Sequence, residues 1–276
     1  MAPVIGNRRR RTLWTAALSL VVLVGIVGLG QALGAEGLAT HLEERNQPPS
    51  LKHPFGTDWM GRDMLTRTLR GLTISLVVGL GASTISAGVG LLLGLISATF
   101  GGKVDAVITW LIDLFMSLPH LVALILISFA LGGGLTGVIV SVAATHWMGL
   151  ARIIRAEVLQ LKSADYVQAS ARMGRSRLWI ARHHILPHLL PQFIVGLILL
   201  FPHAVLHEAG ITFIGIGLSP HQPAIGIILA EAMRHLSTGR WWLAVLPGLA
   251  LLTMVKTFDV LGESIRALTD PRTSQE

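Results

Sequence analysis

Two histidines four residues apart have the clearest capacity for chemistry in this sequence. His203 and His207 fall in an apolar stretch typical of a helix, where residues at i and i+4 share one face. Two imidazoles at that spacing can both bind a borderline metal ion such as nickel or zinc. The alternative is a pair of neutral histidines that hydrogen-bond across helices. The spacing predicts a metal site at His203 and His207 and leaves the structural alternative open.

The sequence contains no recognisable catalytic motif. His207-Glu208 begins like the H-E-x-x-H helix of zinc proteases, but the second His is missing at position 211, which is Ile. Gly102-Lys103 lacks the glycine spacing of a phosphate-binding loop, no G-x-S-x-G is present, and the chain has no cysteine. We therefore predict that the chain is not an enzyme and holds no cofactor.

The composition is that of an integral membrane protein. Of 276 residues, 52% are hydrophobic and 13% are charged, against about 25% charged residues in soluble domains. Residues 12–35, 71–102 and 114–151 carry no charge, and about 20 apolar residues suffice to cross the hydrocarbon core. The positive charges, which give a net charge of +7, lie between these stretches. That placement favours orientation by the positive-inside rule over binding to nucleic acid.

Hydropathy predicts an all-α protein with about six transmembrane helices. The expected spans are residues 13–33, 72–99, 106–131 with a bend at Pro119, 135–150, 189–216 and 242–265. The first apolar run is too long for the hydrophobic region of a secretory signal, so we expect it to be retained. The second span is rich in small residues that predict close helix packing: Gly79, Gly81, Ala82, Ser83, Ser86, Gly88, Gly90 and Gly94.

A polar, arginine-rich loop separates the fourth and fifth spans, at about residues 151–187. Because positive loops resist translocation, we expect this loop and both termini, residues 1–12 and 271–276, in the cytoplasm. Residues 34–71 then form a periplasmic loop, and residues 72–270 form the transmembrane domain. Helical periodicity around a central Gly174 predicts that another protein holds the cytoplasmic loop. The alternative is a helix that lies on the bilayer surface.

Several motifs resemble one family. Gln168-Ala169-Ser170, Gly174 and Ile185-Leu186-Pro187 resemble the cytoplasmic motif of ABC-importer permeases, although Gln168 replaces the usual Glu. HPFGTDWMGRD (53–63), EAGITFIGIG (208–217) and LGESIRALTDPR (261–272) resemble the second, C-type, permease of dipeptide, oligopeptide and nickel importers. The resemblance implies a type I ABC importer permease fold in a bacterial inner membrane. It also implies a second permease, two ATPase subunits that bind ATP, and a substrate-binding protein.

The resemblance assigns roles to three groups of residues. Tyr166, Gln168, Ala169, Ser170, Gly174, Ile185, Leu186 and Pro187 would contact the ATPase. His146, His203, His207 and Glu208 would line the substrate pathway, and the three histidines resemble the nickel type most closely. Asp58, Gly61, Arg62 and Asp63 would form a periplasmic gate or docking surface, with an interfacial anchoring helix as the alternative. We therefore expect import of nickel, free or chelated, with dipeptide or oligopeptide import as the alternative.

Overall fold

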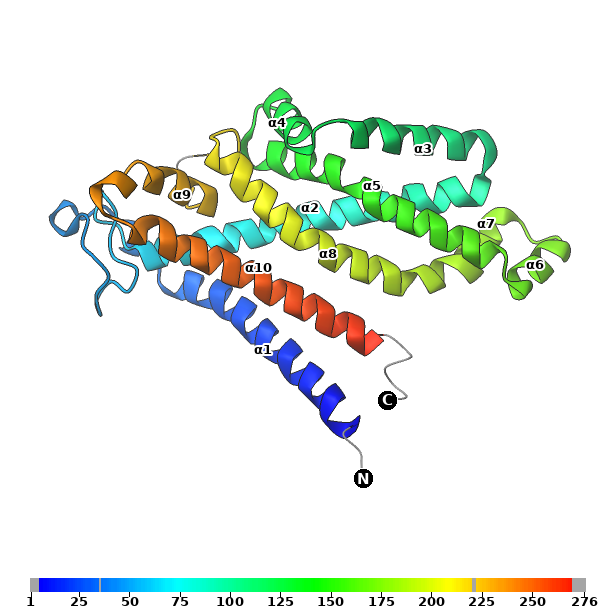
Figure 1. Ribbon diagram of the computed structural model, residues 1–276, viewed down its shortest axis with the longest axis horizontal. Helices are drawn as coiled ribbons and strands as arrows, with labels where there is room; N and C mark the ends of the chain where they lie inside the picture. The colour runs from blue at the N-terminus through cyan, green and yellow to red at the C-terminus, as the bar shows by residue number, and fades with distance from the viewer. Residues whose placement is uncertain (1–4, 35, 220–221, 270–276) are drawn as a thin grey trace.

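The computed structural model describes residues 5–34, 36–219 and 222–269, which form helices joined by loops (Figure 1). The elements in chain order are α1 (Ile5–Ala32), η1 (Glu36–Leu38), η2 (Leu42–Glu44), α2 (Met64–Phe100), α3 (Gly102–Ser117), α4 (His120–Ala130), α5 (Gly134–Lys162), α6 (Asp165–Arg172), α7 (Arg177–Ile180), the π-helical η3 (Ala181–Ile185), α8 (Leu186–Phe213), α9 (Ile225–Met233), η4 (Leu236–Thr238) and α10 (Trp242–Thr269). The described residues include one isolated β-bridge, between Thr57 and Asp63, and no strand. The all-α prediction is confirmed, and the predicted tail at 271–276 lies outside the described residues.

The third predicted span is sharply bent at Pro119, where it divides into α3 and α4. Five helices are long and apolar enough to cross a membrane, or six segments if α3 and α4 together count as one. These two helices meet at an angle of 98°. Pro119 lacks the N–H that a helix needs and forces the preceding Leu118 into extended backbone (φ −80°, ψ 141°). The predicted bend at Pro119 is confirmed, and the crossing of the bilayer by α3 and α4 as one bent span stays a prediction.

Helices α2, α5 and α8 form the centre of the bundle (Figure 1). A Cβ atom at Gly90 would lie 2.9 Å from the carbonyl oxygen of Trp147, and one at Gly94 would lie 2.6 Å from that of Ala151. Only glycine lets the backbones of α2 and α5 approach so closely. The predicted close packing is confirmed at these positions, whereas Gly81 and Gly88 face no neighbour within 4 Å.

Two long helices extend beyond their predicted ends. The predicted fourth span stops at residue 150, but α5 continues to Lys162. Its charged second half is held by partners: Arg155 Nε donates to Asp105 Oδ1 of α3 (2.6 Å), and Lys162 Nζ donates to Ala98 O of α2 (2.8 Å). Helix α2 begins at residue 64 rather than 72, because the Asp63 side chain accepts a hydrogen bond from Thr66 N at 2.8 Å and caps it.

The remaining predicted boundaries shift by a few residues. Helix α8 occupies residues 186–213 rather than 189–216, and α10 extends past residue 265. Helices α1 and α10 pack together, with 3.1 Å between Thr15 Oγ1 and Ser264 Oγ. The start of α1 and the end of α10 therefore lie on the same side of the bundle, away from the loop of residues 36–63 (Figure 1). Which side faces the cytoplasm stays a prediction.

Candidate functional site

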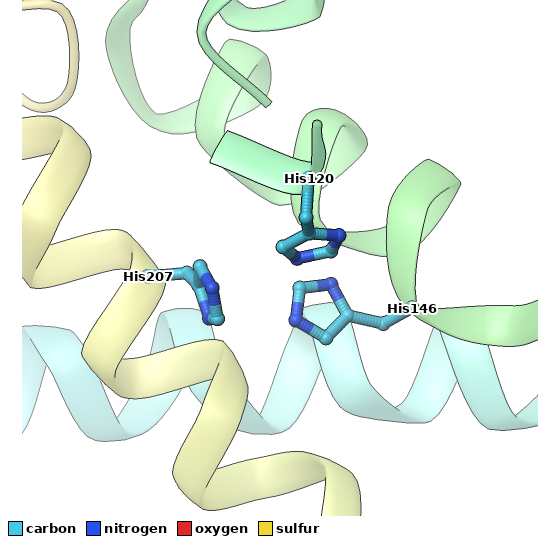
Figure 2. Close-up of side chains that lie close together, drawn as sticks. All are labelled: His120, His146 and His207. Atoms are coloured by element: carbon cyan, nitrogen blue, oxygen red, sulfur yellow. The ribbon is translucent and has the colours of Figure 1, made fainter. Parts of the chain in front are cut away.

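Three histidines from three separate helices converge beside the central bundle. His120 is the first residue of α4, His146 lies within α5, and His207 lies on α8 (Figure 2). Their ring centroids are 4.7 to 4.9 Å apart, and each pair of rings is steeply inclined, at 76° to 81°. One ring nitrogen from each residue lies within 4.8 Å of the other two. We call these residues the three-histidine cluster.

Backbone carbonyls fix two of the three rings. His146 Nδ1 lies 2.8 Å from Val142 O, and His207 Nδ1 lies 2.7 Å from His203 O. A carbonyl can only accept a hydrogen bond, so Nδ1 of each ring carries the proton and Nε2 keeps its lone pair. The Nε2 atom of His146 is buried and has no hydrogen-bond partner. This arrangement, with one nitrogen bonded to backbone and the other free, is typical of histidines that bind metal ions.

The cluster differs from the predicted metal pair. His203 is exposed and donates from Nδ1 to Leu199 O at 3.0 Å. It lies one turn from His207 and is not among the three residues whose ring nitrogens converge. The sequence interpretation missed His120, although its place directly after the Pro119 break was an available signal. The predicted span 135–150 also puts His146 near the end of its helix, whereas α5 continues to Lys162.

Glu208 follows His207 but is used differently. Its side chain is completely buried between α2 and α8. Ser75 Oγ donates to one carboxylate oxygen at 2.6 Å, and Thr212 Oγ1 donates to the other at 3.0 Å. The carboxylate thus cross-links two central helices, and it does not belong to the three-histidine cluster. Its predicted pathway role stays a prediction.

Several ion pairs lie at the end of the bundle that carries the loop of residues 36–63. Asp58, Arg62, Arg67 and Glu231, here called the ion cluster, connect the loop, α2 and α9. Asp58 Oδ2 accepts from Arg62 Nε and from Arg67 Nη1, both at 2.6 Å. Asp58 Oδ1 accepts from the backbone N–H groups of Met60 (2.8 Å) and Arg62 (2.9 Å). Arg67 also donates to Glu231 at 2.8 Å, so its buried guanidinium is paired on both sides.

The other two predicted docking residues also shape this loop. Gly61 has φ +75°, and a side chain there would collide with the backbone of His41. Asp63 contacts His53 Nδ1 at 2.9 Å and caps α2. The alternative prediction is an interfacial helix over residues 53–70 that enters the second span; residues 53–63 form a loop instead, and only residues 64–70 are helical, as the start of α2. All four predicted residues therefore lie in one folded unit, and docking on it stays a prediction.

At the opposite end, residues 163–185 form a compact unit that we call the coupling segment. Helix α6 ends before Gly174, whose φ of +83° lets the chain turn back. The Ser176 side chain then caps α7 by accepting from Trp179 N at 3.2 Å. Ser170 Oγ lies 2.9 Å from His184 Nε2 and joins the two halves of the segment.

The structure places the predicted ATPase-contact residues in and just after this segment. Ser170 and Ile185 are buried, Tyr166, Gln168, Ala169 and Gly174 are exposed, and Leu186 and Pro187 begin α8.

Basic side chains fasten the coupling segment to α2. Lys162, directly before the segment, and Arg177 within it donate to the carbonyl oxygens of Ala98 and Phe100, at 2.8 and 3.0 Å. These are the last carbonyls of α2, where positive charge is favourable. On its outer surface the segment exposes large apolar side chains, Met173 (74%) and Leu178 (68%). Arg177 thus joins the coupling segment to α2, Lys162 joins the end of α5 to α2, and η3 leads from the segment into α8.

Comparisons with known proteins identify the family. A family described as binding-protein-dependent transport system inner membrane component matches residues 90–275, which include α5, α8 and the coupling segment. This chain belongs to that family. It is a permease subunit of an ABC importer, a membrane component without catalytic activity of its own.

Similar proteins agree on the family. The dipeptide transport permease DppC of Bacillus subtilis is 35% identical over 84% of this chain and 72% of its own. A putative peptide transport permease of Brucella suis is 36% identical over 98% of this chain and 90% of its own. The probable D,D-dipeptide transport permease DdpC of Escherichia coli is 35% identical over 85% of this chain and 80% of its own.

Solved structures confirm the fold. The MetNI methionine ABC transporter in an inward-facing conformation matches with a TM-score of 0.62 and 20% identity, over 75% of this chain and 98% of that chain. An amino acid ABC transporter matches with a TM-score of 0.56 and 19% identity, over 73% of this chain and 94% of that chain. The predicted type I permease fold is confirmed. The relatives favour the predicted peptide alternative over the nickel type.

Proposed function

We propose that this permease carries peptide-sized cargo and works with a second permease, two ATPase subunits and a substrate-binding protein. The observation that carries the proposal is the similarity to dipeptide and peptide permeases, which extends over 84% to 98% of the chain in the first relatives. A match of that length includes the helices that would line a route as well as the coupling segment. The similarity to peptide permeases therefore includes helices outside the coupling segment.

A growth assay tests which cargo the importer carries. A strain that lacks this gene, but keeps the rest of the importer, is supplied with dipeptides or oligopeptides as sole nitrogen source. We expect growth only when the intact gene is restored. Equal growth with and without the gene, on peptides of several lengths, would contradict the peptide assignment.

The exposed surface of the coupling segment is the proposed contact with the ATPase. Its apolar side chains at Met173 and Leu178 belong to a basic segment outside the long apolar spans, where a protein partner would cover them better than water. The chain has no cysteine, so single cysteines can be introduced without background. We expect Met173→Cys to cross-link to the ATPase. The matched control is Leu18→Cys, an exposed apolar position on α1 (66%), which should not cross-link to it.

Replacing Gly174 tests whether the contact drives transport. A β-branched residue such as Val strongly disfavours a φ of +83°, so Gly174→Val should distort the turn between α6 and α7. We expect uptake to be abolished while the protein still reaches the membrane. Gly210→Ala is a matched control, because this helical glycine has no neighbour within 4 Å. Undiminished uptake by Gly174→Val would argue against docking through this turn.

The opposite loop is the proposed docking surface for the substrate-binding protein. It is held rigid by the ion cluster, and it exposes Trp59 (44%), a residue type enriched in protein interfaces. Trp59→Cys should cross-link to the binding protein but not to the ATPase. Cross-linking of Trp59→Cys and Met173→Cys to the same partner would contradict the proposed topology.

Import of nickel or a related transition metal is the second candidate function. One observation favours it: the three-histidine cluster, whose free ring nitrogens suit such an ion. Comparing growth on nickel-limited medium with growth on peptides separates the two candidates. A requirement for this gene on the nickel-limited medium would favour the metal.

A further inference from the structure

We infer that His120, His146 and His207 form a binding site for one divalent transition metal ion of the borderline class, such as cobalt, nickel, copper or zinc. The inference rests on the proposed function only in placing the site on the transport route. Binding itself follows from the geometry of the cluster, and it can be measured without transport.

The donor atoms define the class of ion. All three ligands are imidazole nitrogens, and neither a carboxylate nor a thiolate joins the cluster. Magnesium and calcium require oxygen ligands, whereas imidazole suits zinc, copper, nickel and cobalt. Glu208, the nearest carboxylate in sequence, has both oxygens engaged by Ser75 and Thr212. The cluster therefore selects against hard cations.

Two of the ligands are prepared for a metal by their hydrogen bonds. The Nδ1–H groups of His146 and His207 are held by backbone carbonyls one turn earlier, which leaves each Nε2 lone pair unused. For His146 this lone pair is buried without any partner. A purely structural histidine cluster would use such lone pairs in ring-to-ring hydrogen bonds. None joins these three rings in the part of the chain that the structure describes.

The size of the nitrogen triangle is close to what an ion needs. If the three nitrogens are at their largest separation of 4.8 Å, an ion at the centre would be about 2.8 Å from each. Imidazole bonds to zinc are about 2.0–2.1 Å long, so each nitrogen must move inward by about 0.7 Å. His120 directly follows the Leu118–Pro119 break between α3 and α4. A small rotation of α4, together with side-chain rotations of His146 and His207, can therefore close the triangle.

Three ligands also leave the coordination sphere open. A tetrahedral or octahedral ion bound by three nitrogens keeps one to three positions for water or for donor atoms of a cargo. His120 is exposed in this chain, and His146 and His207 are partly buried, so the cluster opens to one face of the bundle. Polar imidazoles are costly against lipid, so this face belongs toward protein or a water-filled route. The site can therefore exchange its ion.

Cobalt(II) binding to the assembled importer tests the inference. The complex is purified through an affinity tag without histidine, and cobalt chloride is titrated while the visible d–d absorption is recorded. X-ray absorption at the cobalt edge then counts nitrogen ligands. We expect a site in the intact complex with about three imidazole nitrogens, and a cobalt–nitrogen distance near the about 2.0–2.1 Å that imidazole makes to zinc.

Single substitutions assign the site to this chain. His120→Ala, His146→Leu and His207→Gln should each weaken cobalt binding at least about tenfold, the lower bound for losing even a supporting partner of a ligand. His188→Ala is the matched control, because His188 lies near the start of α8, makes the same kind of Nδ1 hydrogen bond to a backbone carbonyl (His184 O, 2.7 Å) and lies outside the cluster. It should leave the affinity and the spectrum unchanged. His120 lies on an exposed surface, so its variant tests the site even if a substitution at a more buried position disturbs folding.

Two results would overturn the inference: cobalt binding that survives all three substitutions, or equal loss in His188→Ala. Peptide uptake by the same variants reports separately on the proposed function. Metal binding without metal uptake would leave the site intact and assign the cargo to peptides. Failure of peptide uptake in the intact strain would leave the metal site unaffected.

Discussion

The ion cluster and the three-histidine cluster are both built from polar side chains, but they differ in how many of their polar atoms have a partner. In the ion cluster, Asp58 accepts four hydrogen bonds and Arg67 is paired with two carboxylates. In the three-histidine cluster, the ring nitrogens that face one another are free to bind, and one is buried without a partner. Buried polar groups are normally satisfied, so the first cluster stabilises the fold while the second is left open for a ligand.

Removing Asp58 should have the largest effect on stability. Asp58→Ala leaves the Arg67 guanidinium buried with half of its partners, and breaking a buried ion pair costs about 3–5 kcal/mol. We expect a clear fall in the thermal unfolding temperature of the purified protein, measured by tryptophan fluorescence. The control is Asp113→Asn, which breaks an exposed pair with Arg152 that contributes about 0–1 kcal/mol. Equal effects of the two substitutions would break the comparison.

Replacing His146 should have a small effect on stability despite its central position. His146→Leu loses one hydrogen bond to Val142 O, of about 1 kcal/mol, and removes a buried unpaired nitrogen that costs about 1–3 kcal/mol. We expect the unfolding free energy to be unchanged or raised by about 1 kcal/mol, while cobalt binding is lost. A loss of stability as large as that of Asp58→Ala would show that the histidine is structural.

The smallest effect concerns an exposed pair beside the ion cluster. Lys52 hydrogen-bonds Glu44 and holds the pKa of that carboxyl below its ordinary value of 4.5. The pair therefore contributes stability above that pH, which is lost as the pH falls through the lowered pKa in the folded state. Glu44→Gln should remove this part of the pH dependence of the unfolding temperature. Salt should weaken the effect in the parent protein, and an effect that salt leaves unchanged would point to another acid.

The sequence predicted much of the fold, because hydropathy follows burial in lipid. It failed where a helix continues into a charged stretch. Helix α5 continues through Arg152, Arg155 and Lys162, since partners on α2 and α3 hold these side chains. It predicted the bend at Pro119 but not its angle of 98°, because the angle between α3 and α4 depends on packing rather than on local sequence.

The site was predicted in part. Spacing along one helix can find His203 and His207, but the three-histidine cluster joins three helices whose contacts are tertiary. His146 and His207 were singled out, yet only the fold brings His120 to them. The shape of the coupling segment followed more directly, because Gly174 is the residue type that a left-handed turn requires.

The attachment of the coupling segment to three helices has a mechanical consequence. The chain joins the segment directly to α5 and, through η3, to α8, and Arg177 joins it to α2, so a displacement of the segment reaches all three helices. His207 lies 21 residues beyond the start of α8 at Leu186, or about 32 Å along the axis. A tilt of α8 by about 5° would carry that imidazole by roughly 3 Å. Such a displacement is comparable with the 4.8 Å within which the three ring nitrogens lie. A small movement of the coupling segment would therefore be enough to assemble or separate the three nitrogens of the proposed metal site.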